Sequence, residues 1–321
     1  MREYESCFAP LIRDFITYRK ASDRWNESSY GPNLRIFDRY CRKNYPDETI
    51  LTQEMIDSWC KQRETETNNS CRSRIYVVYS FVKYLSERNL CELHPPKLPR
   101  KNRSIYIPYA FKEDELRMFF ESCDKLPDIP RTQHVLIRKI TVPVFFRLLY
   151  SSGIRTTEAR LLKTADVDLS QGILNIHYSK GHDQHYIVLH DSMLQLMRQY
   201  NEAIQRWYPN RVCFFPAPGD SAHPHTWVEK NFRKIWSQIS DDRHAKAYAF
   251  RHHYATVNIN SWVDSGFSFD DKLAYLSKSM GHTTLESTRY YYSIVPRLAE
   301  ILIEKTEQGF NDLVPEVENE I

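Results

Sequence analysis

The segment "AYAFRHHYAT", residues 247–256, places three nitrogen-rich side chains at the start of an apolar helical stretch. These are Arg251, His252 and His253, and core-type residues resume at Ala255 with helical spacing. Basic side chains usually stay in water, because burying an unpaired charge is costly. One explanation is a phosphate that is held in a pocket at this point, and the rest of the sequence must decide whether it applies.

The overall composition is that of a soluble globular protein large enough for two domains. The chain has 321 residues, of which 41% are hydrophobic and 26% charged. No run of about 18 apolar residues could span a membrane, and the charged start lacks the apolar core of a secretion signal. Seven cysteines without a C-x-x-C pair favour free thiols in a reducing cytoplasm and argue against a cysteine-rich zinc site.

Charge is unevenly distributed along the chain. The formal net charge is only +3, but residues 1–105 contain 19 Lys and Arg against 14 Asp and Glu. From residue 303 onwards there is one Lys against six acidic residues. A positive face on the first part would suit nucleic acid, although a solvated surface without a partner remains an equal alternative from charge alone.

Residues 1–93 are predicted to form a helical domain, because apolar residues recur at helical spacing in four places. Arg72 and Arg74 lie near the polar start of the fourth helix, where they could bind a DNA phosphate. The alternative is a helical bundle that binds nothing. The four apolar stripes are Phe8, Leu11, Ile12, Phe15 and Ile16; Leu34, Phe37 and Cys41; Met55, Ile56, Trp59 and Cys60 after a Thr52 N-cap; and Ile75, Val78, Val82 and Leu85.

The segment "HPPKLPRKNRSIYIP", residues 94–108, is predicted to be an extended linker because it contains four prolines. It has no acidic residue, so it could follow a DNA backbone as a positive strap, or simply join two domains. Its basic residues are Lys97, Arg100, Lys101 and Arg103.

Residues 109–302 are predicted to form a second domain of mixed structure. "ITVPVFFRLLYSSG" reads as a buried helix that ends at Gly153, and "TTEARLL" opens another. "GILNIHYSKGHDQHYIVLH" is typical of two short strands around a turn. Further helices are expected in "SMLQLMRQYNEAIQRW", in "RHHYATVNINSW" and in "SFDDKLAYLSKSMGH", the last beginning at Ser268.

Four short motifs in this second domain carry chemistry, in a fixed order. "GIRTTE" (153–158) contains Arg155, "HYSKGHDQ" (177–184) contains a lysine at a hairpin tip, and "YAFRH" (248–252) contains Arg251. "MGH" (280–282) is followed nine residues later by Tyr291. Each motif alone is weak, since an exposed turn lysine or an Arg–Glu helix pair is common.

Together the four motifs resemble the tyrosine recombinase, or phage integrase, family, in which they occur in this order and at similar spacing. The resemblance implies a mostly α fold with a small antiparallel β-sheet. It also implies an N-terminal helical core-binding (SAM-like) domain over residues 1–93 and an α+β catalytic domain over 109–302. The expected partner is a double-stranded DNA recombination site.

The resemblance implies a reaction that needs neither a metal nor ATP, and no cofactor is expected. A tyrosine, Tyr291, would attack the scissile phosphorus and form a covalent phosphotyrosyl bond. Arg155 and Arg251 would meet the negative charge on the phosphoryl oxygens with paired donors. Lys180 would protonate the leaving oxygen, and His282 would donate a hydrogen bond to the phosphate or help to activate the tyrosine.

Supporting roles fall to Glu158, which is expected to orient an arginine, and to His252, which is expected to be a buried structural ring. The family's usual histidine is Tyr248 here. A phenol can still donate a hydrogen bond to a phosphate, but it cannot act as a base near neutral pH, so Tyr248 either takes a weaker catalytic part or only fixes geometry.

Three consecutive tyrosines occupy positions 290–292. Successive helical residues point about 100° apart, so only one of them can face the pocket. The spacing favours Tyr291, which leaves Tyr290 and Tyr292 for packing or DNA contacts.

The acidic tail, residues 303–321, is expected to dock on a neighbouring protomer if the resemblance holds, giving a tetramer on DNA. The alternative is a helix that folds back on its own chain, with a frayed end. Rival functions are a relaxing topoisomerase with the same chemistry, a catalytically impaired DNA-binding regulator on the same fold and a metal nuclease, for which clustered carboxylates are missing.

Overall fold

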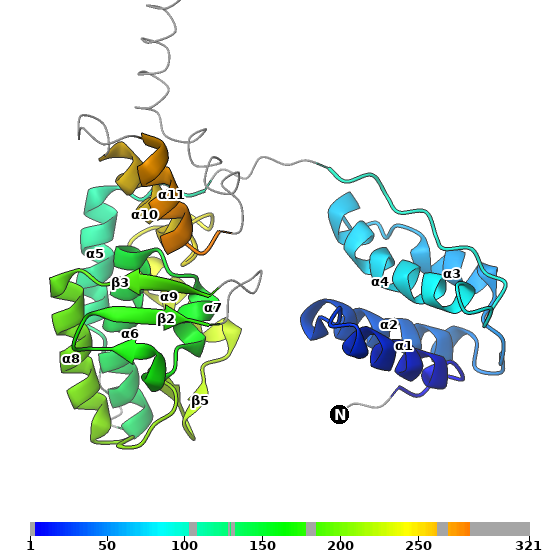
Figure 1. Ribbon diagram of the computed structural model, residues 1–321, viewed down its shortest axis with the longest axis horizontal. Coiled ribbons are helices and arrows are strands. Elements are labelled where there is room, and N and C mark those ends of the chain that lie inside the picture. The colour runs from blue at the N-terminus through cyan, green and yellow to red at the C-terminus, as the bar shows by residue number, and fades with distance from the viewer. Residues whose placement is uncertain are drawn as a thin grey trace, which may run out of the picture. The chain divides into compact units, whose positions relative to one another are not determined.

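The computed structural model describes residues 4–102, 108–127, 129, 132–177, 184–261 and 269–282. The chain divides into two compact units, residues 1–105 and 106–321, and the division falls inside the predicted linker. Figure 1 shows the helices and strands of each unit, and each unit is described separately below.

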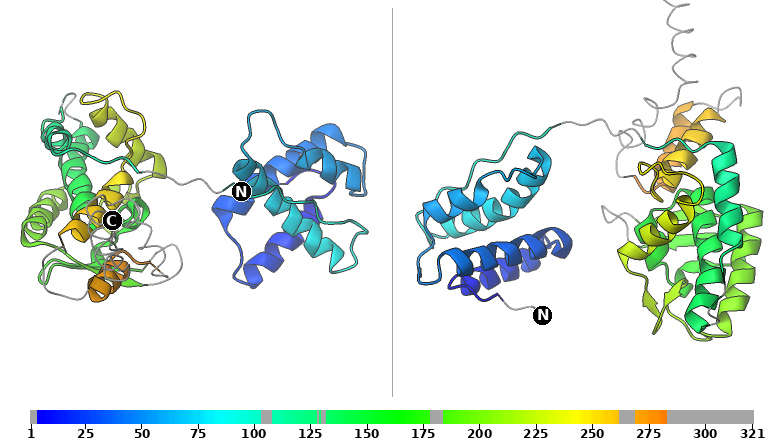
Figure 2. Two further views of the ribbon diagram at one scale, coloured as in Figure 1. Left: turned by 90° about the horizontal axis from the view of Figure 1, so that it is seen from above. Right: turned by 180° about the vertical axis from the view of Figure 1, so that it is seen from behind.

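The N-terminal unit is a bundle of four helices, as predicted: α1 (Ala9–Ala21), α2 (Glu27–Asn44), α3 (Gln53–Cys60) and α4 (Asn68–Ser86). Three of them begin at side-chain caps, which satisfy backbone N–H groups that have no partner within the helix. Asn26 caps α2, Thr67 caps α4, and Thr52 caps α3 as the sequence predicted. Figure 2 shows this bundle from two further directions.

Every predicted apolar stripe of this unit faces its core. The buried residues include Phe8, Ile12, Phe15, Leu34, Phe37, Met55, Ile56, Trp59, Val78, Phe81, Val82 and Leu85. Phe15 and Phe37 both pack against Phe81 of α4, with ring centroids 5.5 and 6.3 Å apart. The helical periodicity of the sequence was therefore a correct guide to this core.

Residues 94–102 contain no helix or strand and run along the surface of the same unit. Hydrogen bonds from side chains of α3 and α4 hold this strap. The side chain of Gln53 accepts the backbone N–H of His94 at 3.0 Å, and Arg72 donates to the Pro99 carbonyl at 2.7 Å. Asn69 accepts the backbone N–H of Asn102 at 3.0 Å and donates to its carbonyl at 2.9 Å. The described part of the linker is thus bound to the bundle along its length.

The C-terminal unit has the buried helix α6 (Gln133–Ser152) at its centre. Helices α5 (Glu113–Asp124), α8 (Asp191–Gln205) and α10 (Ala249–Asn260) all pack against it. The remaining described helices are α7 (Thr156–Leu161), α9 (His225–Trp236), α11 (Phe269–Ser279) and the 3₁₀ turn Thr164–Asp166. Because α6 is surrounded by protein, it is apolar on nearly every side, which is typical of a buried helix.

A small antiparallel sheet lies beside these helices. Its strand order is β1 (Val167–Asp168), β2 (Ile173–Ile176) and β3 (His185–Val188). The predicted hairpin is β2 with β3, in which Ile176 pairs with His185 and Ile173 with Val188. A second, two-stranded sheet joins β4 (Pro216–Ala217) to β5 (Ser221–Ala222). The mixture agrees with the expected mostly helical fold containing a small antiparallel sheet.

The core of this unit fixes where α10 lies. Phe250, in the first turn of α10, is fully buried and packs against Phe111, Phe119 and Phe232, with centroids 4.9 to 5.8 Å apart. Adjacent helical residues point about 100° apart, so an anchored Phe250 directs Arg251 away from the aromatic cluster. The aromatic packing thereby orients the arginine that the sequence singled out.

Within the described ranges, no helix is long and apolar enough to cross a membrane.

Candidate active site

The first arginine, Arg155, lies just after a sharp reversal of the chain. Helix α6 ends at Gly153, whose φ of 63° is left-handed and therefore suited to glycine. A Cβ at this position would collide with the ring of Tyr254 on α10. Arg155 then becomes the N-cap residue of α7. The two requirements on Gly153 explain why the predicted helix end is a glycine, and the close approach of Tyr254 places this turn, two residues before Arg155, against α10.

Glu158 fixes Arg155 from behind, as the resemblance implied. Its carboxylate accepts the Arg155 Nη1–H at 2.5 Å and the Arg155 backbone N–H at 3.0 Å. The Glu158 side chain is 1% exposed and that of Arg155 is 15% exposed. A buried carboxylate with a charged partner holds that partner firmly, because neither group can exchange freely with water.

The second arginine, Arg251, is 2% exposed and binds two segments far away in the sequence. Its Nη1 donates to the Gly153 carbonyl at 2.6 Å, and its Nη2 donates to the Met280 carbonyl at 2.5 Å. Arg155 Nη2 donates to the next carbonyl, that of Gly281, at 2.7 Å. The two guanidinium groups therefore meet at one turn, Met280–His282, although 96 residues separate them in the chain.

His282 completes this arrangement. Its Nε2 lies 3.0 Å from Arg251 Nη2, and because a guanidinium can only donate, Nε2 is the acceptor and the ring proton lies on Nδ1. Burial, followed by the charges of Arg251 and Arg155, lowers the pKa of His282 to about 3. The ring is therefore neutral at physiological pH and offers a single N–H.

Two further predicted residues lie at the start of α10, near Arg251 in the sequence. His252 is buried, and burial together with Arg251 lowers its pKa to about 4. Tyr248 precedes the helix, is 41% exposed, and packs edge-on against His252 with centroids 5.2 Å apart. Tyr248 is thus accessible on the end of α10 that carries Arg251.

The structure brings together Arg155, Glu158, Arg251, His252 and His282. Lys180, Tyr291 and Arg103, together with the acidic tail 303–321, lie outside the described residues. Within the described part of the chain, no group of three or more His, Cys, Asp and Glu side chains could hold a metal ion.

Sequence reasoning missed His185, the first residue of β3. It is 7% exposed, its Nε2 lies 3.9 Å from Glu158 Oε2, and its ring lies against Gly281. The available signal was strand alternation: in "HYIV" the first and third residues face inward, so His185 falls on the buried side.

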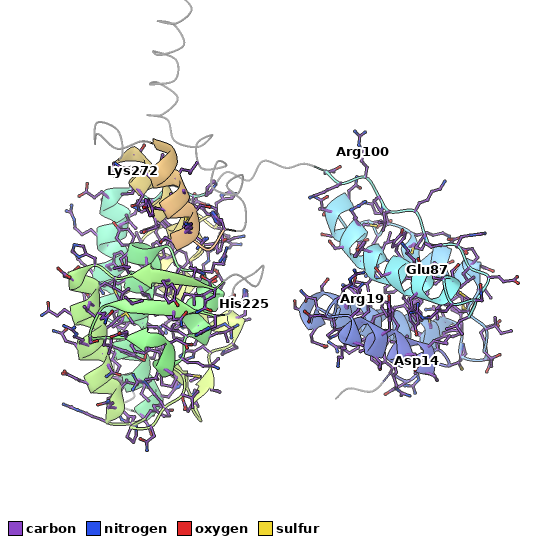
Figure 3. All side chains as sticks on the ribbon, viewed as in Figure 1. Asp14, Arg19, Glu87, Arg100, His225 and Lys272 are labelled. Atoms are coloured by element: carbon purple, nitrogen blue, oxygen red, sulfur yellow. The ribbon has the colours of Figure 1, made fainter. Side chains whose placement is uncertain are left out.

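The basic residues of the N-terminal unit fall into two groups. Lys97, Arg100 and Lys101 are exposed on the strap, and Figure 3 shows Arg100 pointing away from the helices of its unit. Arg72 is half-buried and holds the strap through Pro99.

Arg74 does not fit the expectation of a DNA-facing residue. It is 5% exposed, pairs with Glu66 at 2.7 Å, and donates to the Trp59 carbonyl at 2.5 Å. The helical periodicity explains this: Arg74 lies next to Ile75 and within one turn of Val78, on the side of α4 that faces the bundle. We therefore exclude Arg74 from the interface proposed below.

Residues 110–296 match the model of the phage integrase family. This span is more than half of the chain, so the chain belongs to that family. It is a tyrosine recombinase, an enzyme of the class that cleaves and rejoins DNA.

Relatives along nearly the whole chain agree with this assignment. A putative integrase/recombinase, y4rB, of Sinorhizobium fredii is 23% identical, over 96% of this chain and 99% of its own length. A tyrosine recombinase of Agathobacter rectalis is 25% identical, over 92% of this chain and 95% of its own length.

Solved structures share the fold at lower identity. The XerH recombinase bound to palindromic difH substrate is 18% identical with a TM-score of 0.58, over 87% of this chain and 79% of its own. A lambda integrase dimer bound to a COC′ core site is 12% identical with a TM-score of 0.58, over 92% of this chain and 79% of its own.

Proposed function

We propose that this chain is a site-specific recombinase that exchanges DNA strands through a covalent 3′-phosphotyrosyl intermediate on Tyr291. The observation that carries the proposal is the meeting of Arg155 and Arg251 at the turn Met280–His282. Nothing in the hydrogen bonding of a folded domain requires two arginines to share one turn. A bound phosphate supplies a reason, because its oxygens accept hydrogen bonds from guanidinium groups.

In the proposed reaction the Tyr291 oxygen attacks the scissile phosphorus while the bond from phosphorus to the 5′-oxygen breaks. Lys180 gives its proton to that oxygen, which leaves as a hydroxyl group, and the tyrosine proton passes to solvent. Rejoining is the reverse reaction, with a 5′-hydroxyl as the nucleophile. The phosphotyrosyl bond replaces a phosphodiester bond one for one, so no ATP is consumed and no metal is assigned to the site.

The described residues stabilise charge in this scheme. Arg155 and Arg251 face the phosphoryl oxygens, where negative charge builds up in the transition state. The neutral His282 donates its Nδ1–H to one of the same oxygens. Glu158 keeps Arg155 in place, His252 supports Arg251 through α10, and Tyr248 can donate a hydrogen bond from its exposed hydroxyl.

The DNA partner is proposed to lie along the basic strap of the N-terminal unit. Lys97, Arg100 and Lys101 are exposed there, with Arg72 at the base of the strap and Arg103 just beyond the described part. The solved lambda integrase tetramer bound to a Holliday junction has a TM-score of 0.54 with this chain. We propose that this chain likewise acts as a tetramer on DNA, joined through the tail 303–321.

The test is to trap the intermediate in the presence of EDTA. Nicked duplexes of random sequence are incubated with the full chain, and DNA that remains attached to protein after denaturation is sequenced. The attached residue is then identified by mass spectrometry. We expect an adduct on Tyr291, none with Tyr291→Phe, and unchanged trapping with Tyr290→Phe and Tyr292→Phe. An adduct that persists in Tyr291→Phe would assign the nucleophile to another residue, and trapping abolished by EDTA would point to a metal nuclease.

Resolution of a synthetic four-way junction built from the selected sequence separates recombination from relaxation. A recombinase should resolve it into paired duplexes. An enzyme that only relaxes supercoiled DNA should leave it intact.

A further inference from the structure

His185 lies beneath the turn that holds both arginines. A Cβ built on Gly281 would come 2.5 Å from His185 Cε1, 2.6 Å from Nδ1 and 3.0 Å from Nε2. Near-equal distances to three ring atoms mean that the imidazole lies flat against this glycine. The φ of Gly281 is +60°, a left-handed conformation that independently favours glycine.

The turn above His185 is held by its backbone carbonyls. Gly281 accepts Arg155 Nη2 at 2.7 Å, and Met280 accepts Arg251 Nη2 at 2.5 Å. His282, the third residue of the turn, accepts from Arg251 through Nε2 at 3.0 Å. A shift of Gly281 would therefore move the anchors of both guanidinium groups and of the His282 ring together.

His185 also lies close to Glu158. The distance of 3.9 Å between His185 Nε2 and Glu158 Oε2 is too long for a direct hydrogen bond, but it places the ring beside the carboxylate that fixes Arg155. Strand β3 also packs against α11, the helix that leads into the turn. His185 is thus in contact with both structural supports of the arginine pair, one on α7 and one after α11.

We propose that His185 is a positioning residue of the phosphate site. Its ring packs flat against Gly281 and fixes the position of this glycine, and thereby the positions of Arg155, Arg251 and His282. The inference rests on the proposed function, because it assigns His185 to the cleavage step. It does not place His185 on the substrate. The ring lies against Gly281 and beside the buried Glu158 carboxylate, so it acts through the residues that it supports.

The experiment measures single-turnover cleavage at saturating nicked duplex, together with DNA affinity and thermal midpoint, for four variants. They are His185→Ala, His185→Asn, Gly281→Ala and the double variant of His185→Ala with Gly281→Ala. His190→Asn is the matched control, because His190 is an exposed histidine of the same segment that caps α8 and Asn is a good N-cap.

Removing the ring should slow cleavage by about tenfold to a hundredfold, since misplacement of a catalytic group by about 1 Å costs this much. DNA affinity should stay within about twofold, because the variant removes no DNA contact. His185→Asn should fall between the wild type and His185→Ala, since its amide fills part of the ring's space. Gly281→Ala should cleave DNA slowly. Adding His185→Ala to it should raise the cleavage rate, because the new Cβ enters the space that the ring has left.

Three results would overturn the inference while leaving the proposed function intact. One is cleavage by His185→Ala at the wild-type rate, and another is a double variant slower than Gly281→Ala. The third is a loss of DNA affinity that accounts for the whole defect. Absence of any covalent adduct between DNA and the wild-type chain would instead contradict the proposed function itself. If His185→Ala fails to fold, His185→Asn carries the same comparison.

Discussion

Arg251 Nη2 lies 3.0 Å from His282 Nε2, and this contact determines the protonation state of His282. An arginine donates and cannot accept, so His282 must be neutral for the contact to be favourable. A protonated ring would place two positive groups in contact inside the protein. The histidine of this site is therefore a hydrogen-bond donor through Nδ1, without a proton to release at neutral pH.

This arrangement makes stability depend on pH in a defined direction. The pKa of His282 is lowered to about 3 in the folded state, and that of His252 to about 4, against an ordinary value of 6.5. Between these values and 6.5 the unfolded chain binds more protons than the folded one, so stability falls as pH decreases through this window. Each histidine contributes at most about 1.4 kcal/mol per pH unit.

Urea unfolding of the wild type and of His282→Gln at pH 7, 6 and 5 checks this expectation. The wild type should lose more stability on acidification than the variant, which cannot be protonated at that position. Equal losses would show that His282 is not held neutral by the fold. The measured range, pH 5 to 7, lies above the usual pKa values of carboxyl groups, so the measurement reports mainly on the histidines.

Gly153 is expected to be irreplaceable for two reasons that can be separated. Gly219 has a φ of 73° and nothing within 4 Å of a built Cβ, so Gly219→Ala measures backbone strain alone, about 1 kcal/mol. Gly153→Ala adds a collision with the Tyr254 ring. It should be clearly more destabilising in urea unfolding and should abolish cleavage, because Arg251 is anchored on the Gly153 carbonyl. Equal losses of stability in the two variants would mean that the Tyr254 ring moves aside freely.

Substitutions of the basic residues in the N-terminal unit should affect either DNA affinity or stability, depending on whether the side chain is exposed or buried. Alanine at Lys97, Arg100 or Lys101 should weaken DNA binding and reduce the salt dependence of the affinity by about one counterion each. The fold should be unaffected, because all three side chains are exposed.

Arg74→Ala should behave in the opposite way. It leaves Glu66, whose side chain is 11% exposed, without its partner, and breaking a largely buried ion pair in this way typically costs about 3–5 kcal/mol of stability. The salt dependence of DNA affinity, measured on folded Arg74→Ala protein, should match that of the wild type. A reduced slope in Arg74→Ala at full stability would return this residue to the DNA interface.

Much of the fold could be predicted from the sequence because its signals are local. Apolar periodicity located α1 to α4, Thr52 marked the start of α3, and Gly153 marked the end of α6. The motifs also pointed to Arg155 and Arg251, which the structure brings to one turn, since order and spacing along the chain are visible in one sequence.

What the sequence could not show depends on contacts between distant segments. Arg74 looked like a surface residue because a charged side chain is usually solvated. Its burial is explained by partners outside α4, namely the Glu66 carboxylate and the Trp59 carbonyl. His185 carried no motif, and its position against Gly281 arises from packing between β3 and the end of α11. Helices α5 and α9 were not predicted, although their buried residues recur at helical spacing, for example Leu116 and Phe119 in α5 and Val228, Phe232 and Ile235 in α9.

The central claim, that Arg155 and Arg251 hold one phosphate, is tested most directly by removing the charge of that phosphate. Single-turnover cleavage by Arg155→Ala and Arg251→Ala is compared on the selected nicked duplex and on the same duplex with a methylphosphonate at the scissile position. On the ordinary phosphate each variant should be slower than the wild type by about a hundredfold to a thousandfold. On the uncharged methylphosphonate both penalties should shrink to within about tenfold. A penalty that stays the same on both substrates, for either arginine, would show that this residue does not face the scissile phosphate.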